Sequence, residues 1–379
     1  MKIVFLCSSL EPGCDGVGDY SRRLAGALIL LGHPTLLLAI NDQFIRDKIN
    51  GSQLEDNITI PVFRLPSNWT ASRRFSEAKR WIDEQNPEWI SLQYVPFSFH
   101  SKGLHFGLSK RLLLLGKGRH WHIMFHELWV GMNVEADGKL VWWGRFQKLM
   151  IKSLIKTIKP KVINTQTSIY LEQLKAMGFK GHHLPLFTNI PLIHEKPPFS
   201  FNKLNSVKPT NKIDLVLFGS IFPGVPADAF FKEIAQVSRL KKIQFSMTII
   251  GRTGKEKEHW ANICRIEGLT VNLLDEQEPE SISHVLSNAS IGISTTPVAL
   301  AEKSGSIAAM SRHGLPVICV SKSWRAKGLE NISPLHGVFE YRKGSLEKYF
   351  TANRLPAESY EVTEISARFA RTLLASNSN

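Results

Sequence analysis

Several features that would assign a protein class directly are absent from this sequence of 379 residues. The four cysteines form no C-x-x-C pair, which argues against a zinc site and gives no sign of a disulfide framework. No apolar run reaches the roughly 18–20 residues of a membrane-spanning helix. The apolar stretch at residues 3–7 is too short for a secretory signal. These absences predict a cytoplasmic protein that does not cross a membrane.

Acidic residues are also scarce relative to basic ones. Lys and Arg number 47 against 33 Asp and Glu, which gives a formal net charge of +14. A field of this sign favours anionic partners such as phospholipid surfaces, nucleic acids or nucleotide diphosphates. A solvated basic surface without a specific partner would give the same balance, so charge alone does not choose among these classes.

What the sequence does contain is an alternation of apolar runs and amphipathic stretches, the pattern of a parallel sheet with crossover helices. Strands are expected at residues 2–8, 35–40, 89–93, 122–126, 162–165, 214–218, 245–250, 269–274, 291–294 and 316–320. Helices are expected at residues 19–31, 228–238, 280–287, 306–312 and 358–375. The pattern predicts an α/β protein with two Rossmann-like domains and a cleft between them.

A proline-containing stretch without steady periodicity interrupts this alternation. We therefore expect an N-terminal domain over 1–190, a linker over 191–212 and a second domain over 213–355. The remaining residues, 356–379, are expected to form a helix that packs back on the N-terminal domain.

The first chemically informative stretch, Glu11–Tyr20, joins the first expected strand to a helix. Gly16 and Gly18 would let backbone N–H groups approach an anion at the positive end of that helix. The spacing is not the dinucleotide motif G-x-G-x-x-G, because Ser21 takes the third position. A plain tight turn would explain these glycines equally well.

The second informative stretch places Glu302 and Lys303 before Gly305, which is expected to open a helix beginning with Ser306. A carboxylate at this position can accept hydrogen bonds from sugar hydroxyls. The lysine and the helix N-terminus can hold a diphosphate. The alternative is an ordinary capped helix with a surface ion pair.

Together these motifs resemble glycosyltransferase family 4 and its retaining relatives of the GT-B fold, over most of the chain. The matching segments, in chain order, are Gly16-Val17-Gly18-Asp19-Tyr20, Gly32-His33, His126-Glu127, Asn189, Glu302 with Gly305, and Gly314-Leu315-Pro316-Val317. The resemblance implies a GT-B fold, with the acceptor on the N-terminal domain and the nucleotide-sugar donor on the second.

The resemblance also implies an activity: transfer of a sugar from a UDP- or GDP-sugar, with retention and without a metal or a cofactor. No Asp-x-Asp motif occurs, in keeping with a metal-free reaction. His126 would hydrogen-bond the donor sugar and Glu302 would orient its hydroxyls as the catalytic pair. The implied donor-binding residues are Gly16, Gly18, Asn189, Ser220, Arg252, Lys303, Gly305 and Ser306.

The sequence departs from the family pattern in two places. Met310 stands where the family has a second acid, and alignment from Gly314 would put Ala309 there instead. The loop at residues 219–224 lacks the Arg and Lys that grip the diphosphate in the family, so Arg252 or Lys303 would have to supply the charge. Two alternatives therefore stay open, a non-catalytic relative that binds sugar nucleotide or glycan, and a transferase that modifies nucleic acid. The absence of an arginine-rich aromatic patch argues against nucleic acid.

A basic amphipathic helix is expected at residues 139–161. One stripe carries Arg145, Lys148, Lys152, Lys156 and Lys159, and another carries Trp142, Phe146, Leu149, Met150, Leu154 and Ile158. Such a helix can lie on an anionic bilayer, here the inner face of the membrane, where a lipid-linked acceptor would be found. An ordinary crossover helix, with its apolar side on its own sheet, fits the same pattern.

Overall fold

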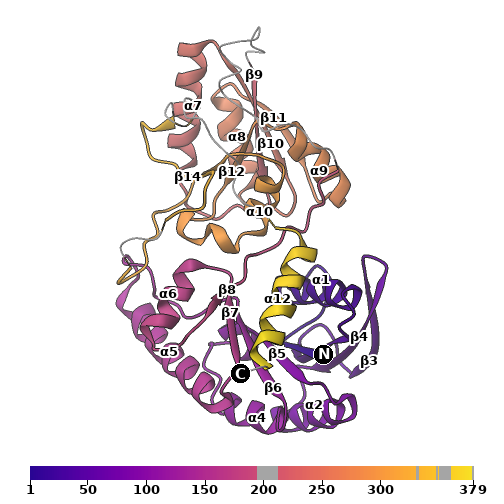
Figure 1. Cartoon of the computed structure of the whole chain (residues 1–379). Helices are drawn as coiled ribbons and strands as arrows, with labels where there is room; N and C mark the ends of the chain where they lie inside the picture. Colours follow the sequence, from indigo (N-terminus) through magenta and orange to yellow (C-terminus); the bar gives the residue numbers. More distant parts are fainter. Residues whose placement is uncertain (194–211, 330–332, 347–348, 350–359, 378–379) are drawn as a thin grey trace. The chain divides into compact units, whose positions relative to one another are not determined.

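The computed structural model describes residues 1–193, 212–329, 333–346, 349 and 360–377 (Figure 1). The chain divides into two compact units. The N-terminal unit contains residues 1–185, 326–329 and 361–379, and the C-terminal unit contains residues 186–325 and 330–360. Most of the predicted linker, 194–211, and most of the segment before the last helix lie outside the described residues. That last helix, α12 (Val362–Asn377), belongs to the N-terminal unit.

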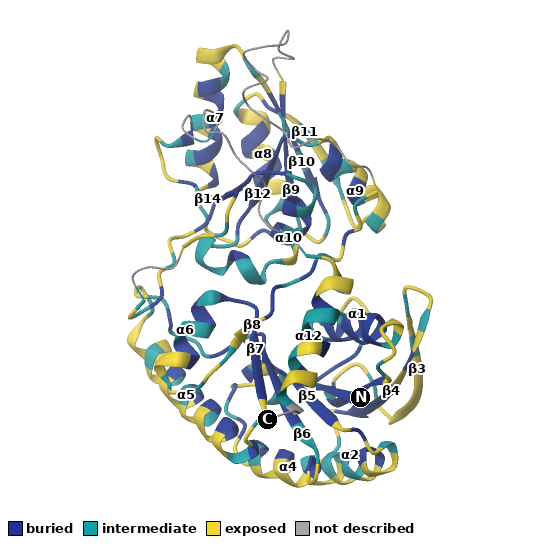
Figure 2. Ribbon diagram, in the orientation of Figure 1, coloured by how far each residue is buried: buried dark blue, intermediate teal, exposed yellow. Residues whose placement is uncertain are grey.

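The N-terminal unit is built on a sheet of eight strands in the order β3-β4-β2-β1-β5-β6-β7-β8. The strands are β1 (Ile3–Cys7), β2 (Thr35–Asp42), β3 (Ile49–Glu55), β4 (Ile58–Pro66), β5 (Trp89–Tyr94), β6 (His120–Phe125), β7 (Val162–Thr165) and β8 (His182–His183). Apart from the antiparallel pair β3–β4, neighbouring strands are parallel. Figure 2 shows the central strands buried between helices. The helices before α12 are α1 (Gly16–Leu30), α2 (Ala71–Gln85), α3 (Pro96–Phe99), α4 (Leu108–Leu115), α5 (Gly138–Ile158) and α6 (Ser168–Ala176).

Helix α12 covers one face of this sheet. The ring of Phe369 lies edge-on to Phe5 of β1, with centroids 5.7 Å apart, and to His122 of β6 at 4.9 Å. Phe369 is completely buried. The last helix is thus a structural part of the N-terminal sheet's core.

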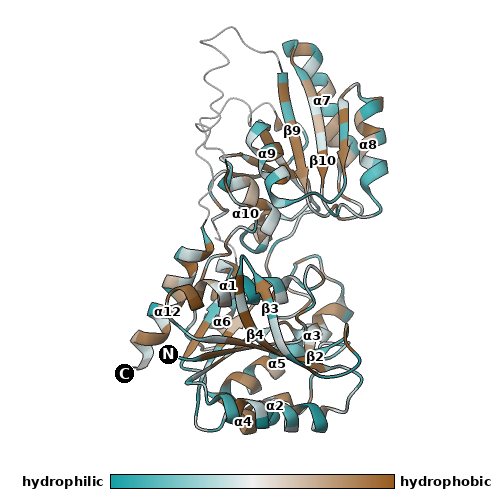
Figure 3. Cartoon of the chain, turned by 90° about the vertical axis from the view of Figure 1, so that its right-hand side faces the viewer, coloured by the Kyte–Doolittle hydropathy of each residue, from teal (hydrophilic) through white to brown (hydrophobic). Residues whose placement is uncertain are grey.

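The C-terminal unit is built on six parallel strands in the order β11-β10-β9-β12-β13-β14. They are β9 (Lys212–Phe218), β10 (Gln244–Ile250), β11 (Thr270–Leu274), β12 (Ile291–Ser294), β13 (Val317–Cys319) and β14 (Val338–Glu340). The described helices are α7 (Ala227–Lys241), α8 (Lys257–Ile266), α9 (Pro279–Asn288), the 3₁₀ helix η2 (Val298–Lys303) and α10 (Gly305–Arg312). In Figure 3 most of β4, β9 and β10 is brown, which marks the hydrophobic residues of strands in both units.

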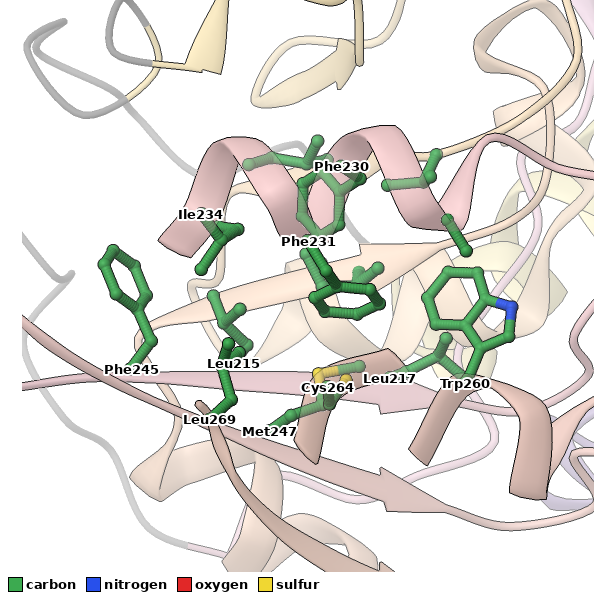
Figure 4. Close-up of a cluster of buried hydrophobic side chains, with 14 of the residues drawn as sticks. Leu215, Leu217, Phe230, Phe231, Ile234, Phe245, Met247, Trp260, Cys264 and Leu269 are labelled. Atoms are coloured by element: carbon green, nitrogen blue, oxygen red, sulfur yellow. The ribbon is translucent and has the colours of Figure 1, made fainter. Parts of the chain in front are cut away.

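Helical periodicity explains how α7 covers this second sheet. Its buried residues, at positions 227, 230, 231, 234, 235 and 237, recur every three to four residues on one face. Phe230 and Phe231 pack there edge to face, and Phe231 meets Trp260 of α8 (Figure 4). Burial of three aromatic side chains at one place makes this cluster a main source of the unit's stability.

Every strand and helix expected from the alternation is confirmed to within a few residues. The α/β class and the two parallel-sheet units are confirmed as well. The elements that were not predicted are the β3–β4 hairpin, β8, β14, α2, α3, α4, α6, α8 and η2. Residues 49–55 are mostly polar and exposed, so the strand lacks the apolar alternation that would reveal it. Its turn, Asp56-Asn57, has positive φ at both residues, which suits a tight hairpin.

Helix α5 exists as predicted, but its six apolar residues do not share one face. Leu154 and Ile158 are buried, whereas Trp142, Phe146 and Leu149 are 52–62% exposed. The residues that α5 buries toward the N-terminal end include Gly144, where a Cβ would lie 1.9 Å from the carbonyl oxygen of Val130. Gly144 thus lies against the loop at Val130, and Trp142 and Phe146 are exposed on a different face, which also carries Arg145. Among the described residues, no helix is long and apolar enough to cross a membrane.

Candidate active site

The loop between β1 and α1 uses its two glycines differently. Asp15 caps α1 by accepting hydrogen bonds from the N–H groups of Val17 (2.9 Å) and Gly18 (3.3 Å). A Cβ on Gly18 would lie 2.8 Å from the carbonyl oxygen of Ser9, so only glycine fits there. A Cβ on Gly16 would meet nothing within 4 Å. Gly18 therefore has a packing role, Gly16 borders open space, and an anion-binding role for either stays a prediction.

A buried ion pair that the sequence did not reveal fixes this loop. The Asp42 carboxylate, with no exposed surface, accepts hydrogen bonds from the Leu10 N–H (3.1 Å) and the Ser9 hydroxyl (3.2 Å). Arg64 donates to Asp42 at 2.8 Å and to Glu11 at 2.6 Å. Asp42 and Arg64 thus tie both ends of the segment Ser9–Glu11 to strands β2 and β4. The one signal for this ion pair in the sequence is the charged residue Asp42, which stands just after an apolar run.

His126, the first residue after β6, is buried and held on several sides. Its backbone N–H donates to the backbone carbonyl of Tyr94 (3.1 Å), and its ring Nε2 lies 2.9 Å from Oε1 of Gln93. Its ring lies edge-on to Tyr20 of α1, with centroids 4.9 Å apart. The structure therefore brings together Tyr20 and His126, two residues of separate motifs more than a hundred positions apart in the sequence.

In the C-terminal unit, the loop after β9 meets the N-terminus of α10. Gly219 has φ +92°, and a Cβ on it would lie 3.3 Å from Cβ of Ser306. Ser304 caps α10 by accepting from the Ile307 N–H, and its hydroxyl lies 3.1 Å from that of Ser306. Glycine at position 219 thus allows the loop backbone to reach the positive end of a helix that begins with a glycine and a serine.

Hydrogen bonds draw two more predicted residues to this edge. The Ser220 hydroxyl donates to the carbonyl of Arg252 at 3.3 Å, and the Ser220 carbonyl accepts from Thr295 at 3.1 Å. The Arg252 side chain forms an ion pair with Glu276 at 2.8 Å, with both side chains 63% exposed. The carboxyl ends of β9, β10 and β12 therefore meet at one place, which is where α/β sheets bind ligands.

Glu302 and Lys303 lie on η2, directly before the cap of α10, and both are partly buried. Gly305 is the first residue of α10, as predicted, and is exposed. Asn189 is exposed as well. Among the described residues, no hydrogen bond joins Asn189 to α10 or to the Gly219–Ser220 loop.

Met310, which replaces the family's second acid, points into the core. It is completely buried on α10, and a Cβ on Gly292 of β12 would lie 2.6 Å from its sulfur. Ala309 is also completely buried. An acid at either position would lose its hydration in an apolar cluster. In this chain neither position presents a side chain to a ligand.

Lys322 is a cation that the sequence analysis missed. It follows β13, and its Nζ would lie 2.8 Å from a Cβ placed on Gly224. It is exposed. The loop at residues 219–224, which has no cation of its own, is thus approached by a lysine from another strand. Only the parallel pairing of β12 with β13 brings these distant segments together, so no local pattern could have shown it.

One surface depression lies away from all of these residues. It has a volume of about 520 Å³ and is lined by residues of α6, β7, β8 and α12, including Asn164, His182, Arg368 and Arg371. None of the predicted site residues lines it. Within the described residues, no group of three or more His, Cys, Asp and Glu side chains is placed to hold a metal ion.

The two parallel-sheet units match solved structures of the GT-B fold. The solved structure of Anabaena Alr3699/HepE with UDP and glucose is 14% identical, with a TM-score of 0.57 over 99% of this chain and 100% of that chain. The pneumococcal O-GlcNAc transferase GtfA, with UDP and GlcNAc, is 11% identical, with a TM-score of 0.56 over 100% and 99%.

WaaG, a glycosyltransferase involved in lipopolysaccharide biosynthesis, is 11% identical, with a TM-score of 0.54 over 99% of this chain and 93% of that chain. No family model matches the sequence, and no curated protein matches it. At these identities the likeness concerns the fold.

Proposed function

We propose that the protein is a glycosyltransferase that moves a sugar from a nucleotide-diphosphate donor to an acceptor. The observation that carries the proposal is the meeting of Gly219 with Ser306 at the N-terminus of α10, on a GT-B fold. Backbone N–H groups at a helix N-terminus favour a diphosphate. The neighbouring cations of Arg252, Lys303 and Lys322 add positive charge at the same edge of the sheet.

In this proposal each group acts on one part of the reaction. Ser220, Gly305 and Ser306 hold the diphosphate, and the nearby cations stabilise the charge that develops as it leaves. Glu302 accepts hydrogen bonds from donor-sugar hydroxyls. His126 contacts the sugar near the reacting carbon, while Gly16 and Asn189 complete the donor site. No metal or cofactor takes part.

A thermal-shift panel of UDP, GDP, ADP, CMP and their sugar conjugates tests this function. A nucleotide present at about a hundred times its dissociation constant stabilises the protein by about 2.7 kcal/mol. We expect UDP or GDP to stand out. Transfer to water or to added glycans is then followed by NMR of the first-formed anomer. This measurement tests whether the transfer retains the anomeric configuration of the donor sugar, as the family resemblance implies. A shift by no nucleotide would contradict the proposal.

Met310 favours a second candidate, a non-catalytic relative that binds sugar nucleotide or glycan. Its burial leaves the site with one acid, Glu302, where the family uses two. Tight nucleotide binding without hydrolysis or transfer would support this candidate. Duplex DNA binding with a steep salt dependence would instead favour a transferase acting on nucleic acid.

We further propose that the protein is cytoplasmic and binds the inner face of an anionic membrane through α5 and its neighbour α4, where a lipid-linked or glycan acceptor is reached. Trp142, Phe146 and Leu149 of α5 are 52–62% exposed, and Leu114 of α4 is 65% exposed. The basic residues Lys110, Arg145, Lys152 and Lys156 are exposed on the same two helices. Each lysine or arginine close to an anionic surface contributes about 1 kcal/mol of attraction.

Flotation with vesicles of mixed zwitterionic and anionic lipid tests this membrane proposal. The parent protein should float at low salt and dissociate as salt screens the attraction. A Trp142→Ser, Phe146→Ser double variant should stay at the bottom. The control, Leu240→Ser with Ile266→Ser, removes two exposed apolar side chains of the C-terminal unit and should float normally. No flotation of the parent at low salt would end the proposal.

A further inference from the structure

A chain of buried side-chain hydrogen bonds crosses the N-terminal sheet and ends at His126. From His126 Nε2 it passes to Gln93 Oε1 (2.9 Å), and from Gln93 Nε2 to the Ser91 hydroxyl (2.7 Å). The Ser91 hydroxyl lies 2.7 Å from Nδ1 of His122, and Nε2 of His122 lies 3.0 Å from Oδ1 of Asn164. The Asn164 amide finally donates to the carbonyl of His182 at 3.2 Å.

The members of this chain come from neighbouring strands and have almost no exposed surface. Gln93 and Ser91 lie on β5, His122 lies on β6 and Asn164 lies on β7. The register pairs Ser91 with His122, which places both side chains on one face of the sheet. Exposed fractions are 0–2% for these four residues and 7% for His126. Leaving any one of these groups without its partner would cost about 1–3 kcal/mol.

The carbonyl of His182, at the far end of this hydrogen-bond chain, sets the direction of every hydrogen bond in it. A backbone carbonyl can only accept, so Asn164 must present its NH₂ group to His182 and its Oδ1 to His122. Nε2 of His122 then carries the proton. Burial lowers the pKa of His122 to about 3, so its ring is neutral and its Nδ1 accepts a hydrogen bond. The Ser91 hydroxyl must donate to that Nδ1.

The same logic continues to His126. Because the Ser91 proton is committed to His122, the Ser91 oxygen accepts from the Gln93 amide, and Oε1 of Gln93 faces Nε2 of His126. Nε2 of His126 is therefore a donor, and in the neutral ring Nδ1 is the acceptor. The tautomer of a residue after β6 is thus fixed by a carbonyl on β8.

We propose that Gln93, Ser91, His122 and Asn164 are positioning residues that hold His126 as its Nε2–H tautomer. In this tautomer Nδ1 can only accept a hydrogen bond, so a hydroxyl of the bound sugar that reaches Nδ1 has to donate to it. This second clause rests on the proposed transferase function, whereas the tautomer itself does not. The arrangement resembles the use of a second partner to orient a catalytic histidine, which locks the ring before substrate arrives.

NMR of protein labelled with ¹⁵N-histidine tests the tautomer directly. We expect His122 and His126 each to show one protonated nitrogen, Nε2, with a slowly exchanging ring proton. His126→Asn identifies the His126 signals by their loss. A parent protein in which His126 is protonated at Nδ1, or at both nitrogens at neutral pH, would overturn the proposal.

Two variants test whether the hydrogen-bond chain from His126 to His182 acts as a unit. Gln93→Leu should abolish the slowly exchanging proton of His126. Asn164→Leu should shift the His126 signals although Asn164 does not touch that ring. Thr165→Val is the matched control, because Thr165 is buried next to Asn164 but donates to the Phe125 carbonyl, outside the chain. It should leave both histidines unchanged, and unchanged His126 signals in Asn164→Leu would contradict a connected chain.

A kinetic measurement separates this inference from the proposed function. If a donor is found, Gln93→Leu should lower kcat/KM by about 100-fold through misplacement of His126, and Thr165→Val should not. If no nucleotide binds the parent, the transferase proposal fails while the NMR result still decides the tautomer. Equal kcat/KM values for Gln93→Leu and the parent would show that the hydrogen-bond chain does not position a catalytic group.

Discussion

The two units present their candidate residues in opposite ways. In the N-terminal unit, His126 and the β1–α1 loop are held by buried polar groups, Asp42 and Gln93 among them, whose partners are fixed by strand register. In the C-terminal unit, the corresponding edge is lined by glycines and by long basic side chains near water, such as Arg252 and Lys322. We therefore expect the N-terminal residues to be fixed before a ligand arrives, and the proposed diphosphate site of the C-terminal unit to depend on backbone N–H groups and exposed cations.

This difference has an energetic consequence. Buried hydrogen-bonded groups are costly to alter because the partner that remains is left desolvated. Exposed ion pairs contribute little to stability because water and salt screen them. Substitutions on the N-terminal side should therefore act mainly on folding and positioning, and those on the C-terminal side mainly on ligand affinity.

The largest expected effect is that of Asp42→Ala. It removes one of the two carboxylate partners of the buried Arg64, leaving only Glu11, and leaves Ser9 and Leu10 without their acceptor. We expect a loss of about 3–5 kcal/mol in the free energy of unfolding, measured by urea denaturation. Glu172→Ala removes the exposed ion pair with Lys175 on α6 and is the control, with little expected change. Similar losses for both would contradict the distinction between buried and exposed charge.

The next largest effect should appear in catalysis. Glu302→Gln keeps the volume of the side chain and removes its charge, so the fold should persist while transfer falls by about 100-fold or more. Steady-state transfer and a thermal melt of the same sample separate the two effects. Glu258→Gln, on the exposed surface of α8, should behave like the parent. Parent-like turnover by Glu302→Gln would remove this residue from the donor site.

Protonation of His122 should destabilise the protein in acid. Because burial lowers the folded-state pKa to about 3, the unfolded chain binds the proton first as pH falls below the ordinary value near 6.5. The unfolded state is then favoured increasingly between about pH 6.5 and pH 3. Urea midpoints measured over this range should fall with pH, and more gently in His122→Gln. An equally steep fall in both proteins would assign the acid sensitivity to other groups.

A smaller effect is expected from Lys322→Ala. Loss of this cation beside the Gly224 turn should weaken binding of the nucleoside diphosphate by about 10-fold, equivalent to about 1.4 kcal/mol. The free nucleoside, which carries no phosphate, should bind as before. Lys343→Ala, an exposed lysine after β14, controls for general charge. A larger loss in Lys303→Ala than in Lys322→Ala would return the main phosphate contact to the residue predicted from the sequence.

Periodicity predicted the central strands of both units because these strands are largely buried and read as continuous apolar runs. It also placed Gly305 at the start of α10 and His126 within one residue of the end of β6. It missed β3, where an exposed polar edge strand leaves no pattern, and several helices, among them α2, α4, α6 and α8. On α5 it placed six apolar residues on one stripe, whereas the structure exposes some of them and buries others.

The partners of the candidate residues could not be predicted in the same way. Whether Gln93 meets His126, or Lys322 meets Gly224, depends on strand order and register, which a single sequence does not contain. The position of Met310 is a further case. The sequence shows only that an acid is missing at this position. The structure shows that the side chain of Met310 is buried in the apolar core, where an unpaired acid would be destabilising.

The smallest expected effect concerns the exposed pair Arg252–Glu276. Glu276→Gln should leave the unfolding free energy essentially unchanged, because both side chains are 63% exposed. If Arg252 binds the diphosphate, however, loss of the competing carboxylate should tighten that binding by about twofold at low salt, and the gain should vanish as salt is added. Calorimetric titration of the nucleotide at two salt concentrations measures this. A weaker affinity in Glu276→Gln would mean that the carboxylate holds Arg252 in its binding position, and that the C-terminal edge is as preorganised as the N-terminal one.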